Sequence, residues 1–197
     1  MVETKTFHHG DLKRVLFEAA LALLDEHGAS GVTIRAVARA AGVSHGAPVN
    51  HYKDRRTLLT AIATHQFELI RERIDRALVR AGNDPKARAR VFLDVLMDFG
   101  FEFPHRYQLL WRADLVDHEH PQLLTIMDGV YDQLCEEIDA IPSRTKNDND
   151  TIAVALWSMV HGYVDMRLSG MFVPLNDEKS GQPRREAMLD LFFSALH

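Results

Sequence analysis

The sequence of 197 residues is poor in features that define several large classes of protein. It has a single cysteine, Cys135, which excludes an internal disulfide framework and favours a reducing compartment. No apolar stretch approaches the ~18 residues that a membrane-spanning helix needs. Residues 1–10 are polar and lack the apolar core of a signal peptide. We therefore expect a cytoplasmic globular protein that does not bind membranes.

Signatures of catalysis are also lacking. The chain contains no G-x-S-x-G, P-loop, H-E-x-x-H or G-x-G-x-x-G motif. Cys135 precedes Glu136 and Glu137, whose charges disfavour the thiolate that a nucleophilic cysteine needs. We expect a protein that is not an enzyme and that has no cofactor.

Two pairs of histidines invite a metal-binding interpretation, which their spacing argues against. His45 and His51 are six residues apart, and on one helix they would lie on different faces. His118 and His120 are two apart and would not share a helix face either. We expect no metal site, and a solvated turn around His118.

Charge is distributed unevenly along the chain. The net charge is −5, yet residues 1–65 carry eight basic against six acidic side chains and six of the eleven histidines. Residues 66–197 carry fifteen basic against twenty-two acidic side chains. This pattern suits a phosphate-binding N-terminal part on an acidic body.

Helical periodicity extends over nearly the whole chain, so the predicted class is all-α with about nine helices. Gly28, Gly42 and Gly82 are expected to end helices, and Asp84-Pro85 to begin one. Within the helix after Pro121 we expect Leu124 to point inward. The helix of about 150–171 is apolar on most sides and is expected to be buried all round.

The stretch AAGVSHGAPVNHY, residues 40–52, is the most informative part of the chain. A short helix capped by Thr33, a turn at Gly42 and a helix over 44–52 capped by Ser44 together predict a helix-turn-helix. Pro48 would lie at the edge of the first turn of that last helix, where a proline is tolerated.

The expected helix over 44–52 presents side chains suited to reading DNA. His45 and Val49 would share a face, with Asn50 beside them, and Asn can bond adenine while Val can contact a thymine methyl group. Lys53, with Arg55 and Arg56, forms a basic cluster for phosphate contacts. An irregular structural turn in a globular core is the alternative interpretation of the same residues.

Residues 9–63, HGDLKRVLFEAALALLDEHGASGVTIRAVARAAGVSHGAPVNHYKDRRTLLTAIA, resemble the DNA-binding domain of TetR-family transcriptional regulators. The resemblance implies an all-helical homodimer with a DNA-binding domain over 1–55 and a larger effector-binding and dimerisation domain over 56–197. It also implies that Val49 replaces an aromatic residue that usually contacts the phosphate backbone. The positions that match DNA-facing positions of the family are Thr33, Arg35, Ser44, His45, Gly46, Val49, Asn50, His51 and Lys53.

The C-terminal part carries Trp157, His161 and Gly162, which resemble the W-x-x-x-H-G signature of one group of TetR C-terminal domains. Aromatic and methionine residues nearby predict a small-molecule pocket for a mostly apolar effector, although ordinary core packing explains them as well. The predicted lining is Phe99, Phe103, Tyr107, Trp111, Met127, Tyr131, Trp157 and His161.

The expected function is that of a repressor released from a palindromic operator by its effector. The last two helices, about 150–171 and 183–196, have the surplus of apolar residues expected of a homodimer interface. The alternative, suggested by Val49, is a helical small-molecule-binding protein or co-regulator of the same fold with weak or lost DNA binding.

Overall fold

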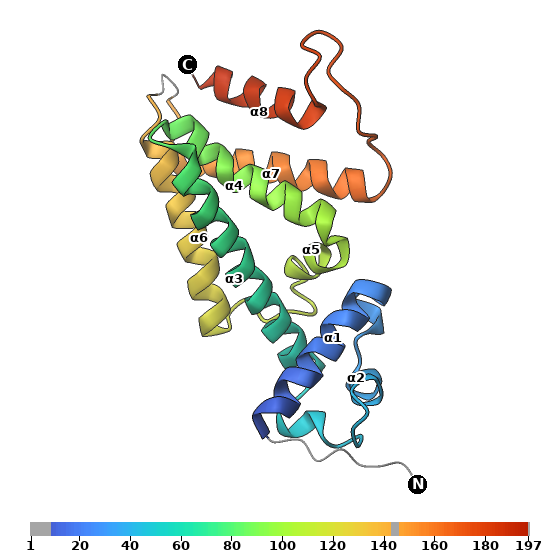
Figure 1. The fold of residues 1–197 in the computed structure, drawn as a ribbon. Coiled ribbons are helices and arrows are strands. Elements are labelled where there is room, and N and C mark those ends of the chain that lie inside the picture. Colours follow the sequence, from blue (N-terminus) through green and yellow to red (C-terminus); the bar gives the residue numbers. More distant parts are fainter. Residues whose placement is uncertain (1–8, 143–145, 197) are drawn as a thin grey trace. The chain divides into compact units, whose positions relative to one another are not determined.

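The computed structural model describes residues 9–142 and 146–196, and this part of the chain is all-α, as predicted (Figure 1). No β-strand occurs in it, and Asn176 and Pro183 form only an isolated bridge. Eight α-helices and one 3-10 helix are close to the predicted nine. They are α1 (His9–Gly31), α2 (Ile34–Ala40), η1 (Pro48–Asn50), α3 (Arg55–Ala81), α4 (Pro85–Glu102), α5 (Pro104–Leu110), α6 (Pro121–Asp139), α7 (Asn149–Leu168) and α8 (Arg184–Ala195).

Helix ends follow local signals in the sequence. The carboxylates of Asp54, Asp84 and Asp148 each accept a hydrogen bond from the backbone N–H three residues later, at 2.8, 3.2 and 2.7 Å. These bonds satisfy N–H groups that a helix leaves unpaired in its first turn. Gly82 follows α3 with a φ of 70°, a left-handed conformation that glycine adopts without steric cost.

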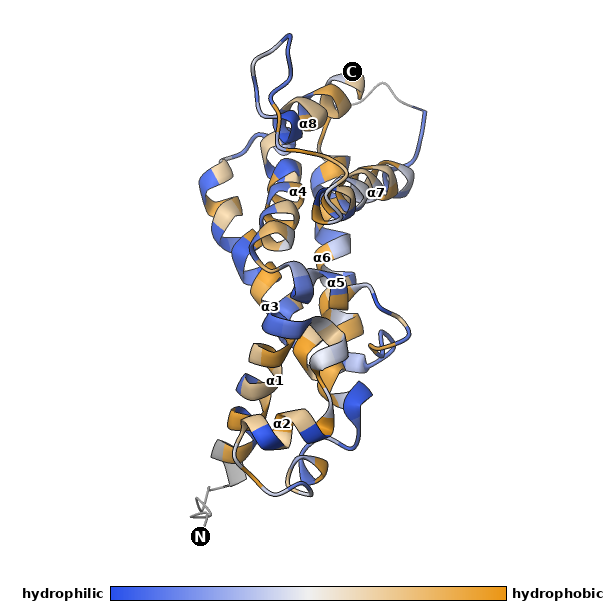
Figure 2. Ribbon diagram, turned by 90° about the vertical axis from the view of Figure 1, so that its right-hand side faces the viewer, coloured by the Kyte–Doolittle hydropathy of each residue, from blue (hydrophilic) through white to orange (hydrophobic). Residues whose placement is uncertain are grey.

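The chain forms two compact units, which are described separately. Unit 1 comprises the residues up to 69 together with 103–126, and unit 2 comprises 70–102 together with the residues from 127 onward. Figure 2 shows polar and apolar residues alternating along the helices, as expected for elements that each bury one face.

The core of unit 1 joins α1, α2, α5 and the first half of α3. On α1 the fully buried line is Leu16, Ala20 and Leu24, whereas Leu12, Val15, Ala19 and Leu23 are only half-buried. Arg106 holds α5 against α1, because its Nε and Nη2 atoms donate to the two carboxylate oxygens of Asp25 at 2.7 and 2.6 Å. Such two-pronged pairs fix orientation as well as distance.

The prediction that Leu124 points inward is wrong. Its side chain is 36% exposed, while Leu123 is fully buried. The buried line of α6 is instead Leu123, Ile126, Val130, Leu134 and Ile138, a regular series at spacings of three and four residues. Leu124 lies one residue beside this line and therefore about 100° around the helix from it.

The prediction that α7 is buried all round is also wrong within a single chain. Its buried side comprises Ile152, Ala153, Leu156, Val160, Tyr163 and Val164. The other side is exposed and includes Val154, which is 50% exposed. The small residues Ala155, Ser158 and Gly162 lie exposed along the same side. The apolar surplus in α7 is thus partly a surface feature of the single chain.

Charged side chains tie α4 to its neighbours in unit 2. Arg88 donates to both carboxylate oxygens of Glu137 on α6, with Nε to Oε2 at 2.8 Å and Nη2 to Oε1 at 2.5 Å. Arg90 binds Asp190 at 2.5 Å and also pairs with Glu186, both on α8. These half-buried pairs place α6 and α8 on α4.

Candidate nucleic-acid interface

The helix-turn-helix begins with a well-capped α2. The hydroxyl of Thr33 accepts a hydrogen bond from the N–H of Ala36 at 3.1 Å, which caps the helix as predicted from the sequence. Gly42 then turns the chain with a φ of 66°. The N–H of Val43 donates back to the carbonyl of Ala38 at 3.0 Å, and the small Ala38 side chain is buried. The turn therefore directs the following residues away from α2 at a fixed angle.

The α-helix predicted over residues 44–52 is not present. The N–H of Ala47 donates to the Ser44 carbonyl at 3.0 Å, and the N–H groups of His51 and Tyr52 both donate to the Pro48 carbonyl, at 3.0 and 2.8 Å. Pro48 has no N–H to give Ser44, so the i to i−4 ladder cannot start there. Gly46 lowers helix propensity further. The segment is a turn followed by the 3-10 helix η1, and the Ser44 side chain caps no helix among the described residues.

Pro48 and Tyr52 anchor this turn in the core of unit 1. Both side chains are buried, as predicted for Tyr52 and not foreseen for Pro48. Burial raises the pKa of the Tyr52 phenol. With its underside fixed, the turn exposes the residues between these two anchors.

The predicted DNA-facing residues of unit 1 gather on an exposed surface, here called the reading surface. It combines the start of α2 with the turn after Gly42. Arg35 and His45 meet on it, since Arg35 Nε donates to His45 Nε2 at 3.3 Å. Of the predicted set, Thr33, Arg35, Ser44, His45, Gly46, Val49, Asn50 and Lys53 are exposed and His51 is half-buried.

The three basic residues after the turn have different roles in the structure. Lys53 is exposed. Arg55 donates from Nε to the carbonyl of Val32 and from Nη2 to that of Ala29, both at 2.6 Å. The Arg55 side chain therefore links α3 to the end of α1, a structural role that sequence reasoning missed. Arg56 donates to the carbonyl of Val116 at 3.2 Å, so its guanidinium is also partly engaged.

The predicted effector-pocket residues fall into both units. Phe103, Tyr107 and Trp111 belong to unit 1, where Trp111 contacts Phe67 and Tyr107 edge-on at ring distances of 5.6 and 5.9 Å. Phe99, Met127, Tyr131, Trp157 and His161 belong to unit 2. A pocket lined by all eight stays a prediction.

Within unit 2 the structure brings Tyr131, Trp157 and His161 together. The rings of Tyr131 and Trp157 lie 6.3 Å apart, and those of Trp157 and His161 lie 5.4 Å apart. The Tyr131 hydroxyl donates to Asp150 at 2.5 Å, and this bond raises the pKa of the phenol. Burial lowers the pKa of His161 to about 4, so its imidazole is neutral at pH 7.

Metal-binding clusters and membrane-spanning helices do not occur in the described part of the chain. Its residues contain no group of three or more His, Cys, Asp or Glu side chains that could hold a metal ion. His118 lies in the predicted turn, with Nε2 2.7 Å from the carbonyl of Leu110. No helix among the described residues is long and apolar enough to cross a membrane.

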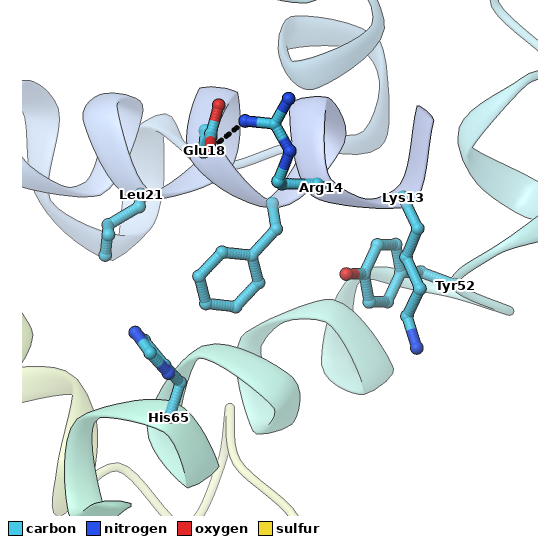
Figure 3. Close-up of a pocket in the computed structure, with 7 residues that line it drawn as sticks. Lys13, Arg14, Glu18, Leu21, Tyr52 and His65 are labelled. Carbon is cyan, nitrogen blue, oxygen red and sulfur yellow. Dashed lines mark hydrogen bonds and ion pairs between the residues drawn. The ribbon is translucent and has the colours of Figure 1, made fainter. Parts of the chain in front are cut away.

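A groove between α1 and the first half of α3 was not foreseen from the sequence (Figure 3). It encloses about 530 Å³ and is lined by Lys13, Arg14, Phe17, Glu18, Leu21, Tyr52 and His65. Phe17 and Leu21 lie beside the fully buried line of α1 rather than on it. The sequence signal that could have indicated the groove is this pair of apolar residues, each one position away from the buried line of α1.

The fold and the reading surface define the class of protein, a helical regulator with an N-terminal helix-turn-helix. Residues 16–62 match the family model of bacterial regulatory proteins of the tetR family. Residues 88–192, more than half of the chain, match that of the tetracyclin repressor-like C-terminal domain. The chain therefore belongs to the TetR family of transcriptional regulators, as the sequence predicted. No curated protein matches the chain.

Solved structures share this fold over nearly the full chain. A protein of unknown function from Rhodococcus sp. RHA1 is 27% identical, with a TM-score of 0.77 and 98% of each chain covered. PfmR, a TetR-family regulator from Thermus thermophilus, is 20% identical with a TM-score of 0.64, covering 98% of this chain and 99% of its own. NalD, the secondary repressor of the MexAB-OprM multidrug efflux pump in Pseudomonas aeruginosa, is 19% identical with a TM-score of 0.62, covering 95% and 96%.

Proposed function

We propose that the protein is a transcriptional repressor that binds a palindromic operator as a homodimer and leaves it when a small, mostly apolar effector binds. The observation that carries this proposal is the reading surface. Eight of its nine candidate residues are exposed, although the adjoining Pro48 and Tyr52 are buried. An exposed set with Arg35, His45, Asn50 and Lys53 offers donors to phosphates and base edges.

The dimer would form through α7 and α8. The exposed side of α7 carries Val154 and small residues that let a second helix approach closely. On α8, Leu191 is 74% exposed. A two-fold axis through such a pair makes an isologous interface, and it would present two reading surfaces to one face of a duplex. The expected half-site spacing is about one helical turn, ~34–36 Å, or slightly more.

The effector would bind in unit 2, near Tyr131, Trp157 and His161. These side chains offer aromatic surface and a neutral imidazole, a combination suited to an apolar ligand with one polar group. An effector shifts the equilibrium only by the difference of its affinities for the DNA-binding and non-binding states. It must therefore bind the non-binding state more tightly.

Footprinting on the DNA upstream of the protein's own gene tests the proposal. The expected result is one protected region with two symmetric half-sites at moderate salt. A chain with Arg35→Ala and His45→Ala should lose the footprint. Protection of no site in this or neighbouring promoters would overturn the proposal.

A second candidate function is ligand binding without DNA recognition. Val49, which is 52% exposed, favours it, because an aliphatic side chain cannot donate a hydrogen bond to phosphate. Binding to random duplex DNA separates the two, since a DNA-binding surface gives an affinity that falls steeply with salt.

A further inference from the structure

All residues that line the groove between α1 and α3 belong to unit 1. None of them is among the residues of unit 2 that are proposed to bind the effector. Its volume of about 530 Å³ is within the range of small-molecule sites. Figure 3 shows Lys13 and Tyr52 at one end of the groove and Leu21 and His65 at the other. The groove thus has two ends of different chemistry.

The Tyr52 hydroxyl is a hydrogen-bond donor that faces the groove. The residue as a whole is 3% exposed and lines the groove, while its hydroxyl oxygen is open to the groove rather than sealed in the core. In Figure 3 this hydroxyl points into the space between the two helices. A tyrosine hydroxyl in this position can donate to water or to an acceptor on a ligand.

The charges around the groove favour an anionic acceptor. Arg14 is already paired with Glu18 at 2.7 Å. At the other end, His65 Nδ1 lies 3.6 Å from Glu68, whose carboxylate also accepts from Gln122 at 3.0 Å. The Lys13 ammonium has no carboxylate within ion-pairing distance among the described side chains. One uncompensated positive charge therefore lies at the Tyr52 end.

The rest of the groove is apolar and partly aromatic. The Phe17 and His65 rings meet edge-on at 5.3 Å, and Leu21 lies at the same end as His65 (Figure 3). Flat aromatic ligands pack well on such edges and faces.

We propose that this groove is a second small-molecule site, which binds a small aromatic carboxylate. The carboxylate accepts a hydrogen bond from the Tyr52 hydroxyl and pairs with the Lys13 ammonium. The ring system packs against Phe17 and Leu21. No other residue of the chain is needed for this recognition, and the site does not depend on DNA binding.

Fluorine NMR of the full-length protein tests the site, with all four tyrosines replaced by 3-fluorotyrosine and assigned by single Tyr→Phe variants. The probe is 2-naphthoate. We expect the Tyr52 resonance to shift saturably, and 2-naphthamide, which lacks the charge, to bind several-fold more weakly.

Two variants make the result specific. Lys13→Glu, on an exposed residue, should weaken 2-naphthoate binding about fivefold or more. Its matched control, Lys179→Glu in unit 2, should leave the affinity unchanged. Leu21→Trp, which fills the groove, should remove the shift. A Tyr52 resonance that stays fixed while those of Tyr131 or Tyr163 move would overturn the proposal. So would a shift of Tyr52 that Lys13→Glu leaves unchanged. The readout involves no DNA, so it fails or succeeds separately from the repressor proposal.

Discussion

Arg35 Nε donates a hydrogen bond to His45 Nε2 at 3.3 Å, joining the first turn of α2 to the turn after Gly42. The two residues are ten positions apart in the sequence and both are exposed. With Nε2 acting as an acceptor, Nδ1 is the ring nitrogen that can donate to a base or phosphate. The pair thus aligns two side chains of the reading surface.

Arg35→Ala should weaken binding to the footprinted operator by about 5- to 100-fold, because one phosphate or base contact is worth about 1–3 kcal/mol. Fluorescence anisotropy with labelled duplex measures this. The matched control is Arg71→Ala, on an exposed arginine of unit 2. Equal affinities for the two variants would show that Arg35 does not contact DNA.

Val49→Tyr should strengthen DNA binding by about two- to tenfold. A phenol at this exposed position supplies the phosphate hydrogen bond that valine cannot make, and such bonds contribute about 1 kcal/mol. The comparison variant is Val49→Phe, which adds the ring without the hydroxyl and should gain less. A tyrosine variant no tighter than the phenylalanine variant would contradict the placement of Val49 beside the DNA backbone.

Arg55→Met should lower the free energy of unfolding of unit 1 by about 2–4 kcal/mol, since the carbonyls of Ala29 and Val32 lose their charge-assisted partners. Urea denaturation followed by circular dichroism gives the value. Arg39→Met, on an exposed arginine of α2, should change it little. A similar small effect at both positions would refute the structural role of Arg55.

His161 should make stability depend on pH. Its pKa is about 4 in the folded protein and 6.5 when unperturbed, so between these values the unfolded chain binds more protons. The stabilisation is complete above about pH 6.5 and declines toward pH 4, by about 2 kcal/mol between pH 7.5 and 5. His161→Gln should flatten this part of the profile in urea denaturation. An unchanged slope would mean that the imidazole is not buried in its neutral form.

The proposed dimer interface can be tested by introducing negative charges on the exposed sides of α7 and α8. Leu191→Glu combined with Val154→Glu should convert the dimer to a monomer in light scattering, because both side chains are exposed in a single chain and would be buried in the pair. Val79 is 84% exposed on α3, and Val79→Glu is the control that should remain dimeric. A dimer that survives the double substitution would place the interface elsewhere.

Local signals in the sequence predicted most of the fold. Capping aspartates such as Asp54, and prolines at helix starts, act through neighbouring backbone groups, so a single sequence suffices to find them. An α-helix was predicted where the 3-10 helix at Pro48 lies. The capping and periodicity of the segment favour an α-helix, whereas the missing N–H of Pro48 disfavours it, and the sequence alone does not show which prevails. In the structure the missing N–H prevails, and the burial of Pro48 and Tyr52 holds the resulting turn in the core of unit 1.

Long-range partners explain the other errors and omissions. In the sequence, Arg55 lies near Lys53 and was therefore predicted to contact phosphate. Its structural role depends on the carbonyls of Ala29 and Val32, which are distant in the sequence and approach it only in the folded chain. Leu124 and Leu123 are equally apolar, and the register of α6 against its neighbours selects Leu123. The exposure of the candidate DNA-facing residues could be predicted, because they lie close together in the sequence, and their contact with DNA stays a prediction.

The dependence of DNA affinity on salt tests the central claim most directly. Anisotropy titrations with the operator duplex and with random duplex should give log affinity falling linearly with log salt, and Arg35→Ala should reduce the slope by about one unit. Binding to neither duplex at low salt, or an affinity that does not change with salt, would contradict a DNA-binding role for the reading surface.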